Sequence, residues 1–200
     1  MYALVIDNEI VRHFQFPKGF ELNENQYSAD VFTKWSSEER QAIGIYEVIT
    51  DSTNKKNEAY YINTNEQFTF ANGQVTRSWG TATAKQLEDI NETDENGVEL
   101  DPVIVIKGLK SQKKDIIKQQ ASGLLEQTDW YNHKALDDDT YTIPDNIKTY
   151  RANVRAKSNE METQINACTN VDELEALYEY TEQEDGSITR PLAEFPTLEI

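Results

Sequence analysis

The sequence predicts an α+β protein, in which an N-terminal antiparallel β-sheet domain is followed by a small C-terminal helical unit, a hairpin plus a third helix. Three observations predict this class: β-rich runs separated by turn residues, a later stretch of amphipathic helical periodicity, and an acidic, turn-rich connector between the two. We therefore expect four divisions: an antiparallel β-domain with one short helix at 1–82, an acidic connector at 83–109, a helical domain at 110–182 and an extended acidic tail at 183–200.

Runs of β-branched and aromatic residues predict the strands of the first domain. They are Tyr2–Ile6, Ile10–Phe16, Ile45–Thr50, Glu58–Asn63, Gln67–Ala71 and Val75–Trp79. Asn72-Gly73 lies between the last two, and both residues tolerate the positive φ of a type I′ turn. Asp7-Asn8-Glu9 is a second turn-like cluster. Together these patterns predict an antiparallel meander.

Two short helices are expected before the long ones. The first is Trp35–Ile43, because Ser36 or Ser37 can cap it, with Glu39 placed for a capping box, and Gly44 is a natural stop. The second lies in the connector, around Ala84–Ile90, ahead of an acidic and turn-rich stretch.

The C-terminal part carries helical patterns in succession. Lys110–Glu126 has apolar residues at helical spacing, and Thr128-Asp129-Trp130 ends it. A helix from Pro144 to Ala167 follows, with Thr142 as the expected cap. A third is predicted over Val171–Tyr180, capped by Asn170. Two prolines make Ser187–Ile200 extended, and a frayed terminus is favoured over strand addition to a partner sheet.

The charge of the chain excludes several classes of function. Nineteen Lys and Arg against 36 Asp and Glu give a net charge of −17, which repels phosphate backbones and anionic membranes. The start of the chain has no basic region of the kind that a secretory signal carries. With one cysteine, Cys168, no internal disulfide forms. We expect a soluble, folded intracellular protein that binds neither nucleic acid nor membrane.

The sequence shows no catalytic residue, metal site or cofactor motif. His13 and His133 have no Cys, Ser or acid at a recognised spacing. Asp137-Asp138-Asp139 lacks the alternating acids of a calcium-binding loop, although a calcium site there stays an alternative. Thirty-six acids always include pairs at a separation suited to glycoside hydrolysis, so a carboxylate-based glycan hydrolase also stays open.

The most informative segment is 111–155. A helical hairpin is expected there, in which Trp130 folds over the end and Tyr150 packs against the first helix. Arg151 and Arg155 lie one helical turn apart and would form a short basic ridge beside Trp130. Trp and Arg are favoured at binding hot spots, so the partner-binding candidates are Trp130, Tyr150, Arg151 and Arg155. The same pattern is also that of a packed hairpin whose arginines pair with local acids, and this interpretation is favoured over docking.

This segment resembles the C-terminal region of bacteriophage tail assembly chaperone and tail-fibre assembly proteins. The resemblance rests on Leu124-Leu125, Thr128-Asp129-Trp130 and Tyr150-Arg151-x-x-Val154-Arg155, where Val154 replaces the usual Leu. It implies a non-enzymatic phage tail protein that binds another tail, tail-fibre or baseplate protein. Its location would be the virion tail, or the host cytoplasm during assembly.

Two other functions stay open at this point. The nearest is an accessory structural subunit of the mature tail, baseplate or fibre. Pairing of the chain with copies of itself, as a homo-oligomer, also stays open. From another class comes the carboxylate-based glycan hydrolase acting on the host surface.

Overall fold

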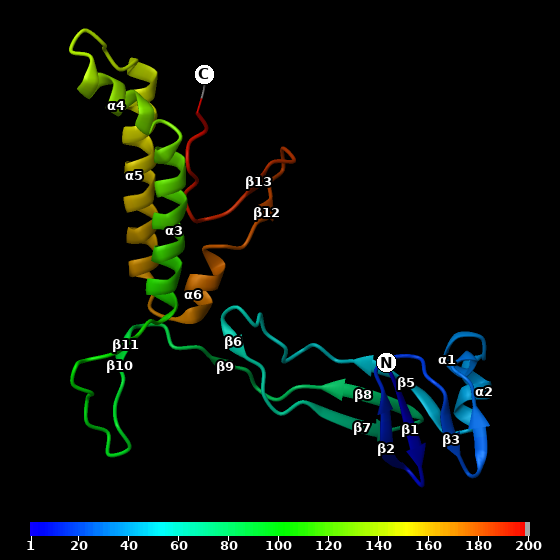
Figure 1. The fold of residues 1–200 in the computed structure, drawn as a ribbon. Helices are drawn as coiled ribbons and strands as arrows, with labels where there is room; N and C mark the ends of the chain where they lie inside the picture. Colours follow the sequence, from blue (N-terminus) through cyan, green and yellow to red (C-terminus); the bar gives the residue numbers. More distant parts are fainter. Residues whose placement is uncertain (199–200) are drawn as a thin grey trace. The chain divides into compact units, whose positions relative to one another are not determined.

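The computed structural model describes residues 1–198 and contains two compact units, Met1–Thr83 and Ala84–Ile200 (Figure 1). The first unit holds a β-sheet with two short helices, and the second is built around a pair of long helices. The expected α+β class is therefore confirmed.

The sheet of the first unit has five strands in the order β2-β1-β5-β8-β7. Their bounds are β1 Tyr2–Ile6, β2 Glu9–Phe14, β5 Ile45–Thr50, β7 Gln67–Ala71 and β8 Gln74–Ser78. Three of these match the expected strands, while β2 stops short of Phe16 and β8 stops short of Trp79. The sequence pattern therefore locates the sheet well and its strand ends less well.

Two tight turns have the backbone that the sequence predicts. Asp7 and Asn8 have φ values of 52° and 66°, and they join β1 to β2 as an antiparallel pair. Asn72 and Gly73 have φ values of 53° and 74°, and they join β7 to β8 in the same way. Positive φ at both central residues is the requirement of a type I′ turn.

The expected antiparallel meander is wrong in two respects. Strand β5 lies beside β1 and not beside β2, which precedes it among the strands of this sheet. β5 and β8 run parallel, with Val48 opposite Val75. The segment 51–66 between β5 and β7 lets the chain reverse, so that β7 becomes the outer strand and β8 returns beside β5. Parallel neighbours need such a connection, whereas a meander uses tight turns throughout.

The two faces of the sheet bury separate groups of side chains. Ala3, Val5 and Val75 form one cluster. Leu4, Phe14 and Ile45 belong to another, which also contains residues from outside the sheet: Phe20, Val31 and Phe32. Alternate residues of a strand point to opposite faces, which accounts for the split between Leu4 and its neighbours.

Helix α2 (Ser37–Ala42) confirms the predicted cap. The Ser36 hydroxyl accepts the Glu39 N–H, and the Glu39 carboxylate accepts the Ser36 N–H, which makes a complete capping box. Three elements ahead of it were not expected. They are the hairpin of β3 (Phe20–Leu22) and β4 (Asn25–Tyr27), and helix α1 (Asp30–Thr33).

The expected strand Glu58–Asn63 is reduced to β6 (Tyr61–Ile62). The N–H groups of Tyr60 and Tyr61 both donate to the carbonyl of Asn57. This turn removes the first half of the run from any ladder.

The helix expected around Ala84–Ile90 is wrong. Residues at its two ends lie in the short strands β9 (Thr83–Ala84) and β10 (Ile90–Asn91). Between them, the carbonyls of Gln86 and Leu87 accept N–H groups from the start of the next helix, so they are not available for a helix of their own.

Helices α3 (Leu109–Glu126) and α5 (Asp145–Ala167) form the antiparallel hairpin of the second unit. Both were predicted, and α5 buries apolar residues along one side: Ile147, Tyr150, Val154, Met161 and Ile165. The expected cap Thr142 is wrong, because Pro144 is the N-cap residue and has extended backbone. Helix α4 (Asp129–Asp137) begins where the first helix was expected to end, and no helix was expected over these residues.

Helix α6 (Val171–Ala176) begins as predicted, with the Asn170 side chain accepting the Glu173 N–H at 2.9 Å, and it ends before the expected Tyr180. A hairpin of β12 (Thr181–Glu182) and β13 (Ile188–Thr189), not foreseen, follows it.

The expectation of a frayed tail is wrong for the described residues. Leu192 is buried, and its N–H donates to the Leu177 carbonyl at 3.0 Å. Phe195 and Leu198 pack against the cluster of Ala121, Tyr150 and Val154. The end of the expected tail, at Ile200, lies outside the described residues.

Candidate functional site

The guanidinium of Arg151 joins the end of α3 to the start of α4. Its Nη1 donates to the Leu125 carbonyl and to Thr128 Oγ1, each at 2.7 Å. Its Nη2 lies 2.8 Å from Asp129 Oδ1. Arg151 is buried, so these contacts supply most of the partners that its donors need. We call this arrangement of Leu125, Thr128, Asp129 and Arg151 the elbow.

Thr128 completes the elbow. It is fully buried, and its hydroxyl donates to the Leu125 carbonyl at 3.0 Å while it accepts from Arg151. The Leu125 carbonyl is one of the last of α3, where the helix leaves acceptors without intrahelical partners and favours a cation. The elbow therefore satisfies the end of α3 and sets the direction in which α4 departs.

The basic ridge expected at Arg151 and Arg155 is wrong for Arg151. This side chain is turned inward and paired with Asp129, as the alternative of a packed hairpin requires. Arg155 is exposed, and its Nη1 donates to the Arg151 carbonyl at 3.3 Å. Helical spacing places both residues on one side of α5, but the departing α4 covers only one of them.

The two aromatic candidates also differ in exposure. Trp130 is 51% exposed, and its ring centroid lies 3.8 Å from that of Tyr131, its neighbour on α4. Tyr150 is buried under the C-terminal tail, next to Phe195 and Leu198. Of the four predicted residues, Trp130 and Arg155 are therefore at the surface, and Tyr150 and Arg151 are structural.

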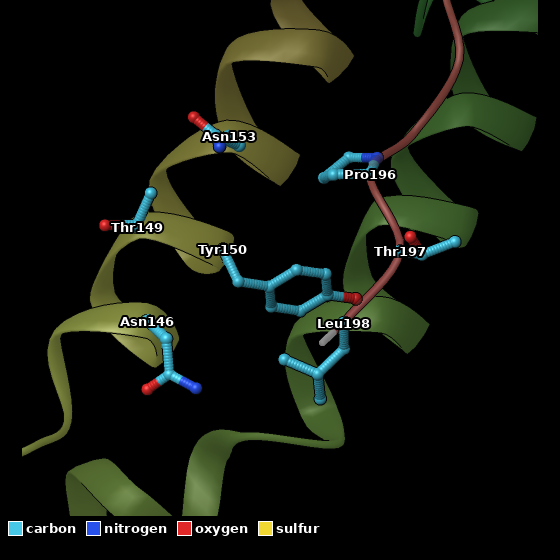
Figure 2. A pocket seen from close by; sticks show the side chains of 7 residues that line it. All are labelled: Asn146, Thr149, Tyr150, Asn153, Pro196, Thr197 and Leu198. Carbon is cyan, nitrogen blue, oxygen red and sulfur yellow. The ribbon is translucent and has the colours of Figure 1, made fainter. Parts of the chain in front are cut away.

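A pocket of about 350 Å³ lies between α5 and the tail (Figure 2). Its lining is neutral: Asn146, Thr149, Tyr150, Asn153, Pro196, Thr197 and Leu198. The amide and hydroxyl groups can donate and accept hydrogen bonds, but no group there offers a charge. The tail side of this pocket was not predicted, although the spacing of Leu192, Phe195 and Leu198 indicates a segment with one apolar side.

A second pocket, of about 330 Å³, contains the single cysteine. The Cys168 thiol donates to the Gln164 carbonyl at 3.5 Å, and burial raises its pKa. A protonated thiol is a poor nucleophile, so this arrangement is that of a structural cysteine.

Carboxylates with shifted pKa values serve turns and caps. In the aspartate triplet, hydrogen bonds from the Thr140 hydroxyl and N–H lower the pKa of Asp138. Across residues 1–198, no group of three or more His, Cys, Asp and Glu is placed to hold a metal ion. Within the same part of the chain, no helix is long and apolar enough to cross a membrane.

No family model, no curated protein and no solved structure matches this chain. Inference about function therefore starts from the elbow, from the exposed surface of α4 and from the resemblance of the segment that contains them.

Proposed function

We propose that this chain is a non-enzymatic phage tail protein that binds another component of the tail, tail fibre or baseplate during assembly. One observation supports it above others: residues that carry the resemblance are connected to one another in the elbow. Arg151 contacts Leu125, Thr128 and Asp129 directly. Contacts among these residues support the interpretation of the pattern as one structural unit.

The elbow presents α4 as a binding surface. None of the residues of α4 is buried, and Trp130 and Leu136 are 51% and 79% exposed. An isolated helix of nine residues is marginal in water, so α4 depends on the elbow at its start. An exposed Trp on a helix held at a fixed angle is suited to act as an anchor in a partner's pocket.

Binding to this surface is tested with Trp130→Ala. We expect the variant to bind its tail partner at least tenfold more weakly while its melting temperature stays within about 2 °C of the wild type, because the ring is half exposed. Ile188→Ala, which also truncates an exposed apolar side chain, is the matched control and should bind normally. Equal affinity of all three proteins would contradict the proposal.

The location of the protein separates an assembly factor from a subunit of the mature tail. Quantitative mass spectrometry of purified phage particles counts the copies of this chain per virion. Abundance in the lysate with absence from particles indicates an assembly factor, and a fixed multiple of three or six indicates a subunit. Release of reducing sugar from host surface glycan by the purified chain would instead support the hydrolase.

A further inference from the structure

Residues 90–106 form a hairpin, which we call the arm, immediately before α3 (Figure 1). Strand β10 pairs with β11 (Val105–Ile106), with Ile90 opposite Ile106 and Asn91 opposite Val105. The pairing continues one step further, where the Glu92 N–H donates to the Ile104 carbonyl at 2.8 Å. The arm is a two-stranded sheet, and such a hairpin is only marginally stable by itself.

The base of the arm is fixed to α3. The Asp89 carboxylate accepts the Gly108 N–H at 2.8 Å and the Ser111 hydroxyl at 2.9 Å, so it connects the base of the arm to the start of α3. A Cβ on Gly108 would lie 2.3 Å from the Glu88 carbonyl oxygen, which means that only glycine permits this close approach. Lys107 adds an ion pair with Asp115 at 2.5 Å. The arm therefore leaves α3 in a defined direction.

Both faces of the second strand of the arm are apolar and open to solvent. Val103, Ile104, Val105 and Ile106 are each between 45% and 54% exposed, and successive residues point to opposite faces. A continuous β-branched run is typical of a strand that is covered on both faces. Within residues 1–198, no other segment buries either face of this strand. Its side chains are therefore typical of a strand that is buried, although here they are about half exposed.

The outer edge of β11 also has a free hydrogen-bonding position. The hydrogen bond from the Glu92 N–H to the Ile104 carbonyl places these two residues at a hydrogen-bonding position of the ladder, and such positions alternate with non-hydrogen-bonded pairs. Asn91 and Val105 are the next pair, so the N–H and C=O groups of Val105 point away from β10. Within the described part of the chain, β11 has no third strand beside it.

The charge of the arm selects its partner. Five acids and no Lys or Arg lie between residues 90 and 106: Glu92, Asp94, Glu95, Glu99 and Asp101. Two arms from two copies of this chain, each with a net charge of −17, would repel one another. Acids beside an exposed edge block self-pairing, while they attract a surface that carries the opposite charge.

We propose that the arm binds a partner protein by strand addition, in which the outer edge of β11 pairs with an exposed strand edge that is flanked by Lys and Arg. This inference rests on the proposed function, because it names the kind of surface that the bound tail component offers. The main-chain groups of Val105 supply the hydrogen bonds, the Val103–Ile106 run supplies the buried apolar area, and the acids supply the charge preference.

The test blocks one edge of the arm at a time. The probes are the purified tail, baseplate and fibre proteins of the phage that encodes the chain, each titrated with the full-length protein. Val105→Pro removes the outward N–H of β11, and proline is tolerated at an edge where the N–H faces solvent. Asn91→Pro is the matched control, because it removes the outward N–H of β10 in the same residue pair. We expect Val105→Pro to weaken binding at least tenfold and Asn91→Pro to change it less than twofold.

Two further measurements on the wild-type protein test the proposal even if a proline unfolds the arm. In the wild-type complex, hydrogen exchange of the Val105 amide should slow at least tenfold, and affinity should fall as NaCl is raised from about 50 to 500 mM. Binding that Trp130→Ala abolishes and Val105→Pro leaves intact, with no change in Val105 exchange, overturns the arm proposal alone. Absence of binding by the wild type overturns the arm proposal and the proposed function together.

A second copy of the chain is the competing occupant of β11. Analytical ultracentrifugation of the wild type by itself should show a monomer at low salt. A dimer that Val105→Pro dissociates, and Asn91→Pro does not, would overturn the proposal in favour of self-association.

Discussion

At the scale of single residues, the burial of Arg151 makes it a structural residue and not a surface contact for a partner. Arg151→Ala removes the donor to Thr128 Oγ1 and the cation beside Asp129, while the Leu125 carbonyl keeps the Thr128 hydroxyl as a donor. Loss of a partner by buried polar groups costs about 1–3 kcal/mol. We expect the free energy of unfolding, measured by urea titration, to fall by that amount in Arg151→Ala.

Arg155→Ala is the control for this prediction. The side chain is exposed on the same helix, so its loss should change stability by less than about 0.5 kcal/mol. If Arg151→Ala were as stable as Arg155→Ala, the elbow would not hold α4 in solution.

The contacts of Asp89 with the start of α3 predict how its carboxyl group titrates. Hydrogen bonds from the Gly108 N–H and then from the Ser111 hydroxyl lower the pKa of Asp89 below its ordinary value of 3.8. Since the folded pKa is lowered, the stabilisation that this carboxylate gives is present above the unfolded pKa and is lost as pH falls through the folded pKa. NMR titration of the Asp89 carboxyl carbon should show the low pKa, and Ser111→Ala should raise it.

Asp94 provides the control in the same experiment. Its pKa is lowered by the Val98 and Asn96 N–H groups inside the arm, so Ser111→Ala should leave it unchanged. An equal rise in the pKa of Asp89 and of Asp94 would indicate a general change of the arm. It would contradict a specific hydrogen bond between Ser111 and Asp89.

At the scale of elements, the sequence predicts the turns and helix caps that depend only on residues close together in the chain. The capping box of α2, the Asn72-Gly73 turn and the Asn170 cap each depend on residues within three or four positions, and each forms as expected. The buried face of α5 follows from its period for the same reason.

Elements that depend on distant partners could not be predicted. The pairing of β5 with β8 is decided by the path of the chain over residues 51–66, and nothing local distinguishes it from a meander. Arg151 lies on the buried side of α5 between Ile147 and Val154, and its polar partners Thr128 and Asp129 come from a distant turn that its own spacing does not reveal. The arm's second strand contains the aliphatic run Val103–Ile106, but the exposure of these side chains depends on which other residues of the unit pack against them.

The C-terminal tail, expected to be frayed, is packed against the helices of the second unit. Leu192 is 2% exposed, and Gln164 accepts the Ala193 N–H at 2.9 Å and donates to the Pro191 carbonyl at 3.0 Å. Leu192→Ala removes a buried side chain and leaves a cavity, which costs about 2–5 kcal/mol. Urea unfolding should show this loss.

Ile188→Ala is the control for the tail, because Ile188 lies 68% exposed on β13. Its truncation should change stability by less than about 0.5 kcal/mol. A Leu192→Ala variant as stable as this control would mean that the tail does not stay on α6 in solution.

At the scale of the whole molecule, each unit has a core built from its own residues. Phe14 and Ile45 belong to a cluster that runs only through the first unit, whereas Tyr150 and Val154 belong to one confined to the second. A core that is complete within one unit can unfold without the other. This organisation suits a protein that carries separate surfaces, the arm and α4, on a unit distinct from the β-sheet.

The prediction that follows is a pair of separable unfolding transitions. Phe14→Ala should lower the melting temperature of one transition in differential scanning calorimetry, and Leu174→Ala should lower that of the other, because both side chains are fully buried. Each substitution costs about 2–5 kcal/mol, which for a unit of about 100 residues corresponds to roughly 8–40 °C. A single transition that both variants shift by the same amount would show that the two units unfold as one, and the β-sheet unit would then contribute directly to the stability of the surfaces that bind the partner.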